Sequence, residues 1–229
     1  MFIVYILLWM LLIVVGGGWL VGRQRRQARR GIEQLAAALG FRLLEGMDAV
    51  DRTILPARRQ AAKEAREKVP AALRGMVNRA ARGALCAAGT IDGVEVSVYF
   101  ETRGPKSNTY YTSVRADYAK PLPFELRVGS EGALTRLGKA FFDLADVEIG
   151  DPEFDRAVRV KASDADAARS ALRRPGARDA LLGLRTLSTS AHATNDMALW
   201  EEQGRHFELA RTRERVAAVV AVARAIGSD

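Results

Sequence analysis

The sequence predicts an α+β fold, in which a mainly antiparallel sheet and its packed helices follow one N-terminal transmembrane helix. Three observations support this prediction: an uncharged apolar run opens the chain, strand-like alternation begins near residue 84, and helical periodicity follows in several later stretches. We therefore divide the chain into a transmembrane anchor over residues 1–22, a basic juxtamembrane helical segment over 23–83, and a soluble α+β domain over 84–229.

The apolar run from Phe2 to Gly22 has the length and composition of a membrane-spanning helix. It is 21 residues long and contains no ionisable side chain except Tyr5. At about 1.5 Å per residue it extends roughly 30 Å, which is the thickness of a hydrocarbon core. A cleaved signal peptide is the main alternative, but it requires a basic start and a shorter apolar core. No Lys or Arg precedes this run, so we favour the anchor.

A basic cluster follows the run and sets the predicted orientation. It consists of Arg23, Arg25, Arg26, Arg29 and Arg30. Arginines beside a membrane span stay in the cytoplasm, so we expect a single-pass protein of the cell inner membrane whose C-terminal domain is cytoplasmic. The same arginines are the predicted membrane-surface residues, because anionic headgroups attract juxtamembrane basic segments. The lipid bilayer is thus the first expected partner.

The location of the net charge of +8 disfavours nucleic acid as a partner. Residues 23–83 hold 15 Lys and Arg against 6 Asp and Glu, whereas residues 84–229 hold 20 against 21. The positive excess therefore lies beside the apolar run, in a segment whose one aromatic residue is Phe41. Surfaces that bind nucleic acid combine basic residues with aromatic ones.

The predicted domain begins with strand signals and continues with a mixture of strands and helices. Val94, Val96 and Val98 alternate with polar residues, and the preceding Asp92-Gly93 pair favours a two-residue hairpin turn. The expected strands cover residues 41–44, 86–91, 94–101, 110–117, 124–128, 157–162, 187–193 and 197–201, and the expected helices cover 31–39, 57–69, 71–84, 132–142, 164–172, 177–184 and a C-terminal stretch from Leu209 to Ile226.

An acidic-Pro-aromatic motif lies in the middle of the domain, before a predicted strand. The motif and the residues that accompany it are Asp151-Pro152-Glu153-Phe154-Asp155, Val158-Arg159-Val160, Asp164, Ala168-Arg169, Leu172 and Leu181-Leu182. In this region the chain resembles a family of uncharacterised membrane-anchored bacterial proteins. The family has no established chemistry, so the resemblance implies only topology and the type of soluble domain. By its apolar character, Phe154 is expected to anchor the core.

Motifs for catalysis, metals and nucleotides do not match this sequence, and no cofactor is expected. The carboxylates over residues 146–155 lack the Gly and Glu positions of a calcium-binding EF-hand loop. Gly104-Pro-Lys-Ser lacks the spacer of a phosphate-binding loop. Ser188, Ser190 and His192 would lie on one strand face, too far apart for direct Ser–His hydrogen bonding. Cys86 is expected to be a small buried residue.

The leading functional hypothesis is a non-enzymatic protein-interaction or scaffold module that binds another protein or a second copy of itself. A predicted exposed strand face with Tyr99, Tyr110 and Tyr111 would provide the contact surface. One alternative is an unrecognised membrane-proximal enzyme. Another is an anionic-lipid surface sensor that uses residues 57–83, although packing of this segment on its own domain is favoured because its apolar face is largely alanine.

Overall fold

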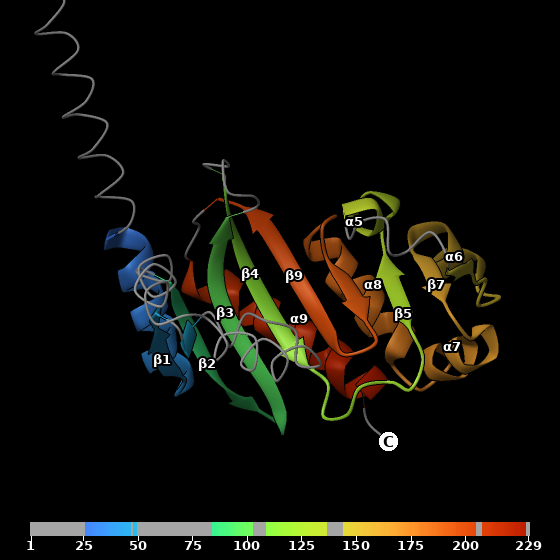
Figure 1. The fold of residues 1–229 in the computed structure, drawn as a ribbon, viewed down its shortest axis with the longest axis horizontal. Helices are drawn as coiled ribbons and strands as arrows, with labels where there is room; N and C mark the ends of the chain where they lie inside the picture. The colour runs from blue at the N-terminus through green and yellow to red at the C-terminus, as the bar shows by residue number, and fades with distance from the viewer. Residues whose placement is uncertain are drawn as a thin grey trace, which may run out of the picture.

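One antiparallel sheet forms the centre of the molecule (Figure 1). The computed structural model describes residues 26–46, 48–49, 84–102, 109–136, 144–204 and 208–227. Within these ranges the sheet has nine strands in the order β1-β2-β3-β4-β9-β8-β5-β7-β6, and every neighbouring pair is antiparallel. The strands are β1 (Arg42–Glu45), β2 (Leu85–Ile91), β3 (Val94–Thr102), β4 (Tyr110–Asp117), β5 (Leu126–Gly129), β6 (Ala145–Asp146), β7 (Arg159–Ala162), β8 (His192–Thr194) and β9 (Met197–Gln203).

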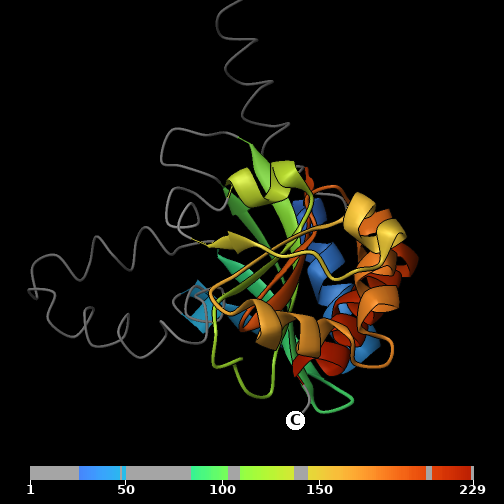
Figure 2. The same ribbon diagram turned by 90° about the vertical axis from the view of Figure 1, so that its right-hand side faces the viewer.

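Helices pack against one face of this sheet. Figure 2 shows α8, α9 and the helix over residues 26–39 on the same side of the strands. The labelled helices are α5 (Glu131–Arg136), α6 (Pro152–Ala157), α7 (Ala165–Leu172), α8 (Ala177–Leu187) and α9 (Leu209–Gly227). The mixture of an antiparallel sheet with packed helices confirms the α+β class predicted from the sequence.

The period-two alternation of the strands determines which side chains meet the helices. Val96 and Val98 of β3 lie in register with Ala116 and Val114 of β4, and Val114 is paired in turn with Trp200 of β9. All five side chains are fully buried. They pack in one core with the α9 residues Val216, Val219, Ala223 and Ile226. The predicted C-terminal helix therefore turns these apolar residues toward the core.

The hairpin between β2 and β3 follows the prediction closely. Asp92 has φ of +50° and Gly93 has φ of +81°. Positive φ at both central residues is the requirement of a type I′ turn, which Asp-Gly satisfies with little strain. The turn fixes the register between the two strands, with Ile91 opposite Val94.

The acidic-Pro-aromatic motif forms a short helix, α6, which is not among the helices expected from the sequence. The Asp151 carboxylate accepts hydrogen bonds from the backbone N–H groups of Glu153 and Phe154, both at 3.2 Å. Pro152 occupies the first helical turn, where its missing N–H has no cost. Phe154 is fully buried, which confirms its predicted role as a core anchor.

Residues near the start of the described chain belong to the same folded unit as the rest. Ile32 and Leu35 of the helix over residues 26–39 are fully buried in the main core, together with Phe41. The helix ends at Gly40, which has φ of +66°. Strand β1 then pairs with β2, so a part of the predicted basic segment contributes both a helix and a strand to the sheet domain.

The predicted transmembrane helix is not supported by the structure, and the fold class is corrected on this point. No helix in the described ranges combines the length and apolar character needed to cross a membrane. The longest labelled helix, α9, has 19 residues and carries several charges along its length. Residues 2–22, on which the prediction depended, lie outside the described residues.

Other predicted features also lie outside the described residues. These are Arg23 and Arg25, the helix predicted over 57–69, the helix predicted over 71–84 apart from Ala84, the Gly104-Pro-Lys-Ser stretch, and the end of the helix predicted over 132–142.

Replacing Phe154 with Ala tests its role in the core. Since the side chain is fully buried, we expect Phe154→Ala to lower the free energy of unfolding by about 3–5 kcal/mol and the half-buried Phe124→Ala by about half as much. Urea unfolding followed by circular dichroism measures both. Equal losses from the two variants would contradict the placement of Phe154.

Candidate binding groove and the buried polar face

An open groove lies where the β2–β3 turn, the chain after β4, the start of α8 and the end of α9 come together. Its volume is about 760 Å³, within the range of roughly 300–1,000 Å³ that is common for ligand sites. Most of its lining is small and apolar, with methyl groups from five alanines: Ala119, Ala180, Ala221, Ala223 and Ala225. The groove is therefore shallow, and a bound molecule could approach the backbone closely.

Two contacts hold the end of α9 in place beside this groove. A Cβ atom at Gly227 would lie 2.7 Å from Cβ and Cγ of Tyr118, so only glycine lets the helix end against the chain that leaves β4. Arg174, before α8, donates a hydrogen bond of 2.9 Å to the Ile226 carbonyl oxygen. That bond satisfies one of the carbonyl groups left without a helical partner at a C-terminus.

Three charged side chains line the groove: Arg174, Arg224 and Asp92. The Arg224 guanidinium is 3.1 Å from the Asp92 carboxylate, and the two side chains are 60% and 62% exposed. An ion pair this exposed contributes roughly 0–1 kcal/mol because water and salt screen it. A carboxylate from another molecule can therefore compete with Asp92 at little cost.

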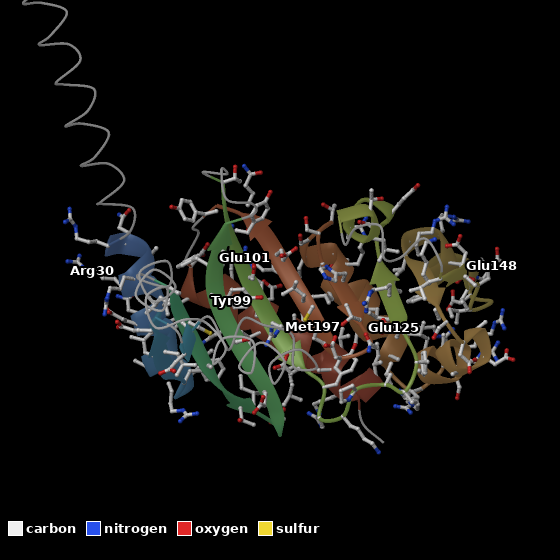
Figure 3. The ribbon with its side chains drawn as sticks, in the orientation of Figure 1. Arg30, Tyr99, Glu101, Glu125, Glu148 and Met197 are labelled. Atoms are coloured by element: carbon white, nitrogen blue, oxygen red, sulfur yellow. The ribbon has the colours of Figure 1, made fainter. Side chains whose placement is uncertain are left out.

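The predicted membrane-surface arginines lie away from this groove. Arg26 and Arg30 are exposed on the helix over residues 26–39, and Figure 3 shows Arg30 beyond the β1 end of the sheet. Arg29 is 2.8 Å from Glu33 and 2.5 Å from Glu45. The hydrogen bond that Arg29 donates to Glu33, and secondly the charge of Glu45, raise the pKa of Arg29. The part of this cluster that is described thus already includes an ion-paired arginine, and its role at a membrane surface stays a prediction.

The second face of the central strands is polar, and its side chains are buried. Figure 3 shows Tyr99 and Glu101 along β3 and Met197 at the start of β9, with α9 on the far side of the sheet. The register places these residues beside a set of polar groups on β3, β4 and β9. Each of the following is at most 4% exposed: Ser97, Tyr99, Ser113, Arg115, Asp117 and Glu201.

A buried ion pair occupies the centre of this polar face. Arg115 Nε lies 2.8 Å from Asp117 Oδ1, and Arg115 Nη2 donates to Asp117 Oδ2 at 3.3 Å. Within the described residues, the hydroxyl groups of Ser97 and Ser113 have no hydrogen-bond partner. Such groups are costly in an apolar interior, so this face differs physically from the apolar face that meets α9.

The prediction of an exposed tyrosine face was wrong. Tyr99 is 4% exposed and packs with Ala49, Cys86 and Ala88. Cys86 is fully buried, as predicted. The register places Tyr111 opposite Glu101 on the polar face, while Tyr110, one position earlier, points to the other face. Burial, and secondly the charge of Glu101, raises the pKa of Tyr99.

Side chains that resembled catalytic or metal-binding groups have structural partners. Asp155 accepts hydrogen bonds of 3.0 Å from the backbone of Ile149 and Gly150. Ser188 Oγ donates to the Glu201 carbonyl oxygen at 2.8 Å. His192 Nδ1 is 3.1 Å from the Ser190 carbonyl oxygen. In the described ranges, no group of three or more His, Cys, Asp or Glu side chains is arranged to hold a metal ion.

Comparison with known proteins shows a likeness of fold. No protein-family model matches the sequence, and a search of curated proteins finds no match. Among solved structures, the chain is similar to the crystal structure of the mycobacterial trehalose monomycolate transport factor A, TtfA. The TM-score is 0.51 at 14% sequence identity, and the match covers 87% of this chain and 94% of that chain. At this identity the likeness shows the fold alone.

Replacing Asp117 tests how much the buried ion pair with Arg115 contributes to stability. We expect Asp117→Asn to lower the free energy of unfolding by about 3–5 kcal/mol, because it breaks a buried ion pair by removing one of its two charges. Replacing both residues in Arg115→Met/Asp117→Leu removes both charges and is expected to cost less. Urea unfolding measures both variants, and a double variant less stable than the single one would contradict this account.

The buried tyrosines predict a loss of stability in alkali. Burial raises the pKa of Tyr99 and of Tyr118 above the ordinary value near 10. The unfolded chain therefore loses these protons first, so the stabilising contribution is present below about pH 10 and decreases as the pH rises further. We expect the urea midpoint of Tyr99→Phe/Tyr118→Phe to fall less steeply than the wild-type midpoint between about pH 9 and 11. Parallel curves would contradict the burial of these hydroxyl groups.

Proposed function

We propose that this chain is a non-enzymatic accessory protein that acts by binding another protein, and that the groove at the end of α9 is the binding surface. The observation that carries the proposal is the groove itself, which has an apolar floor, charged side chains at its edge and a volume of about 760 Å³. A central apolar contact with a polar rim is the usual anatomy of a protein-binding surface.

The fold comparison supports an accessory role. The similar structure is named as a transport factor, and the likeness extends over 87% of this chain. A fold alone does not specify a function. The proposal therefore depends on the groove, and the likeness of fold is only additional support for it. We propose by this analogy that the present chain assists a process carried out by its partner.

The paired polar groups support binding over catalysis. Ser188 and His192 contact backbone carbonyl groups, and Asp151 caps α6 while pairing with Arg178 at 2.7 Å. These contacts account for the side chains that first suggested hydrolysis or metal binding. The lipid-sensor hypothesis depends on residues 57–83, which lie outside the described residues.

Site-specific photocrosslinking in living cells tests the proposal. A photoreactive amino acid at Ala221 would lie in the groove, whereas one at Ala210 would lie exposed near the start of the same helix. The two positions are 11 residues apart, or roughly 16 Å along α9. We expect a discrete protein adduct from position 221 and none from position 210. Identical adducts from both positions, or none from position 221, would contradict the proposal.

Purified components then test the same surface directly. The partner identified from the adduct should bind the wild-type chain, and Ala221→Trp should weaken that binding by at least about tenfold because the indole fills a shallow groove. Ala210→Trp is the matched control and should bind like the wild type.

A further inference from the structure

We infer that the groove recognises an acidic segment with small side chains, whose carboxylate replaces Asp92 on Arg224. This inference rests on the proposed binding function and specifies the chemistry of the partner. It follows from three properties of the groove: the small side chains of its floor, the sign of the charge at its edge, and the weakness of the ion pair that now occupies the edge.

The floor selects a segment that can come close to the backbone. Ala180 and Ala225 are half-buried and Ala223 is buried, so the floor consists of methyl groups and main-chain atoms. Large partner side chains have no deep pocket to enter here. The open form also disfavours a lipid acyl chain, because such a chain requires an enclosed apolar cavity to leave water. A peptide segment with alanine-sized side chains fits this surface best.

The charged side chains at the edge of the groove favour a ligand with negative charge. Arg174 and Arg224 both line the groove, against one carboxylate from Asp92. Arg174 also caps α9 through the Ile226 carbonyl oxygen, which keeps its guanidinium beside the groove. Arg224 extends from the last two turns of the same helix. A planar guanidinium suits a carboxylate ligand because it offers two parallel N–H donors.

Exchange of the carboxylate at Arg224 is physically easy. Asp92 belongs to the tight β2–β3 turn, and its carboxylate accepts a hydrogen bond of 3.1 Å from Arg224. Both side chains are more than half exposed. An incoming carboxylate that forms two hydrogen bonds and excludes water gains more than this screened contact loses. Asp92 would thus act as an internal competitor for the partner.

A matched control pair lies at the start of α9, with Arg211 in its first turn and Glu208 directly before it. Arg211 lies 3.0 Å from Glu208, and these side chains are 68% and 61% exposed, close to the values for Arg224 and Asp92. Neither Arg211 nor Glu208 lines the groove. Substitutions at this pair change the local charge by the same amount as those at Arg224 and Asp92. They do so about 20 Å away from Arg224 along the helix.

The experiment repeats the crosslinking from position 221 in five further variants. We expect Arg224→Glu to reduce the adduct about tenfold and Asp92→Asn to increase it about two- to fivefold, because one variant repels the partner carboxylate and the other removes its competitor. Arg211→Glu and Glu208→Gln should leave the yield unchanged. Arg224→Gln, which removes the positive charge without reversing it, should give an intermediate loss. The urea midpoint of each variant checks its folding. The crosslinked partner peptide should contain more Asp and Glu than Lys and Arg.

Several outcomes would overturn the inference and separate it from the proposed function. If the wild-type background gives no adduct at position 221, the proposed function fails. If the adduct forms but responds equally to Arg224→Glu and Arg211→Glu, or if its peptide is neutral or basic, only the acidic chemistry fails. Binding of the purified chain to phosphatidylglycerol vesicles that is lost in Arg224→Glu, without any protein adduct, would instead assign the groove to an anionic lipid.

Discussion

The packing of α9 on the apolar face of β3, β4 and β9 is the interaction on which the rest of the structure depends. Trp200 is fully buried in this contact. The guanidinium of Arg215 on α9 stacks 3.8 Å from the centre of its ring and also binds Glu202 at 2.7 Å. Burial lowers the pKa of Arg215, while Glu202 opposes that effect. The contact both closes the core and fixes the direction of the helix, so that its last turns meet α8 and form one wall of the groove.

The two faces of the sheet have different physical roles. The face toward α9 is apolar and supplies the hydrophobic stabilisation of the domain. The other face carries the Arg115–Asp117 pair and buried hydroxyl groups, which add little net stability but discriminate against a shift of strand register. A slip by one residue would place these charges in the apolar core. The same alternation therefore stabilises the fold and determines its register.

Local sequence signals predicted most of the helices and strands, whereas the candidate site could be identified only in the folded structure. Asp92-Gly93 predicted the hairpin, and the alternation over 110–117 matched β4 to the residue. The helix α6 was missed, although Asp151 before Pro152 is a helix-start signal, because six residues give too little periodicity. Tyr99 was expected to be exposed because alternation alone does not show whether a second face is covered. The transmembrane helix was inferred from the length and apolar composition of one run, and the described helices do not include one. The groove combines segments from four parts of the chain, so no local pattern identifies it.

The most direct test of this account is hydrogen–deuterium exchange on the full chain, alone and with its purified partner. If the end of α9 forms the working surface, amide protection on binding should increase at residues 92–94, 174–180 and 221–227 together, since these segments line one groove. The amides of β3 after residue 94 and those of β4 should exchange at the same rates with and without the partner. Protection confined to residues 26–39, with no change at the end of α9, would contradict the account.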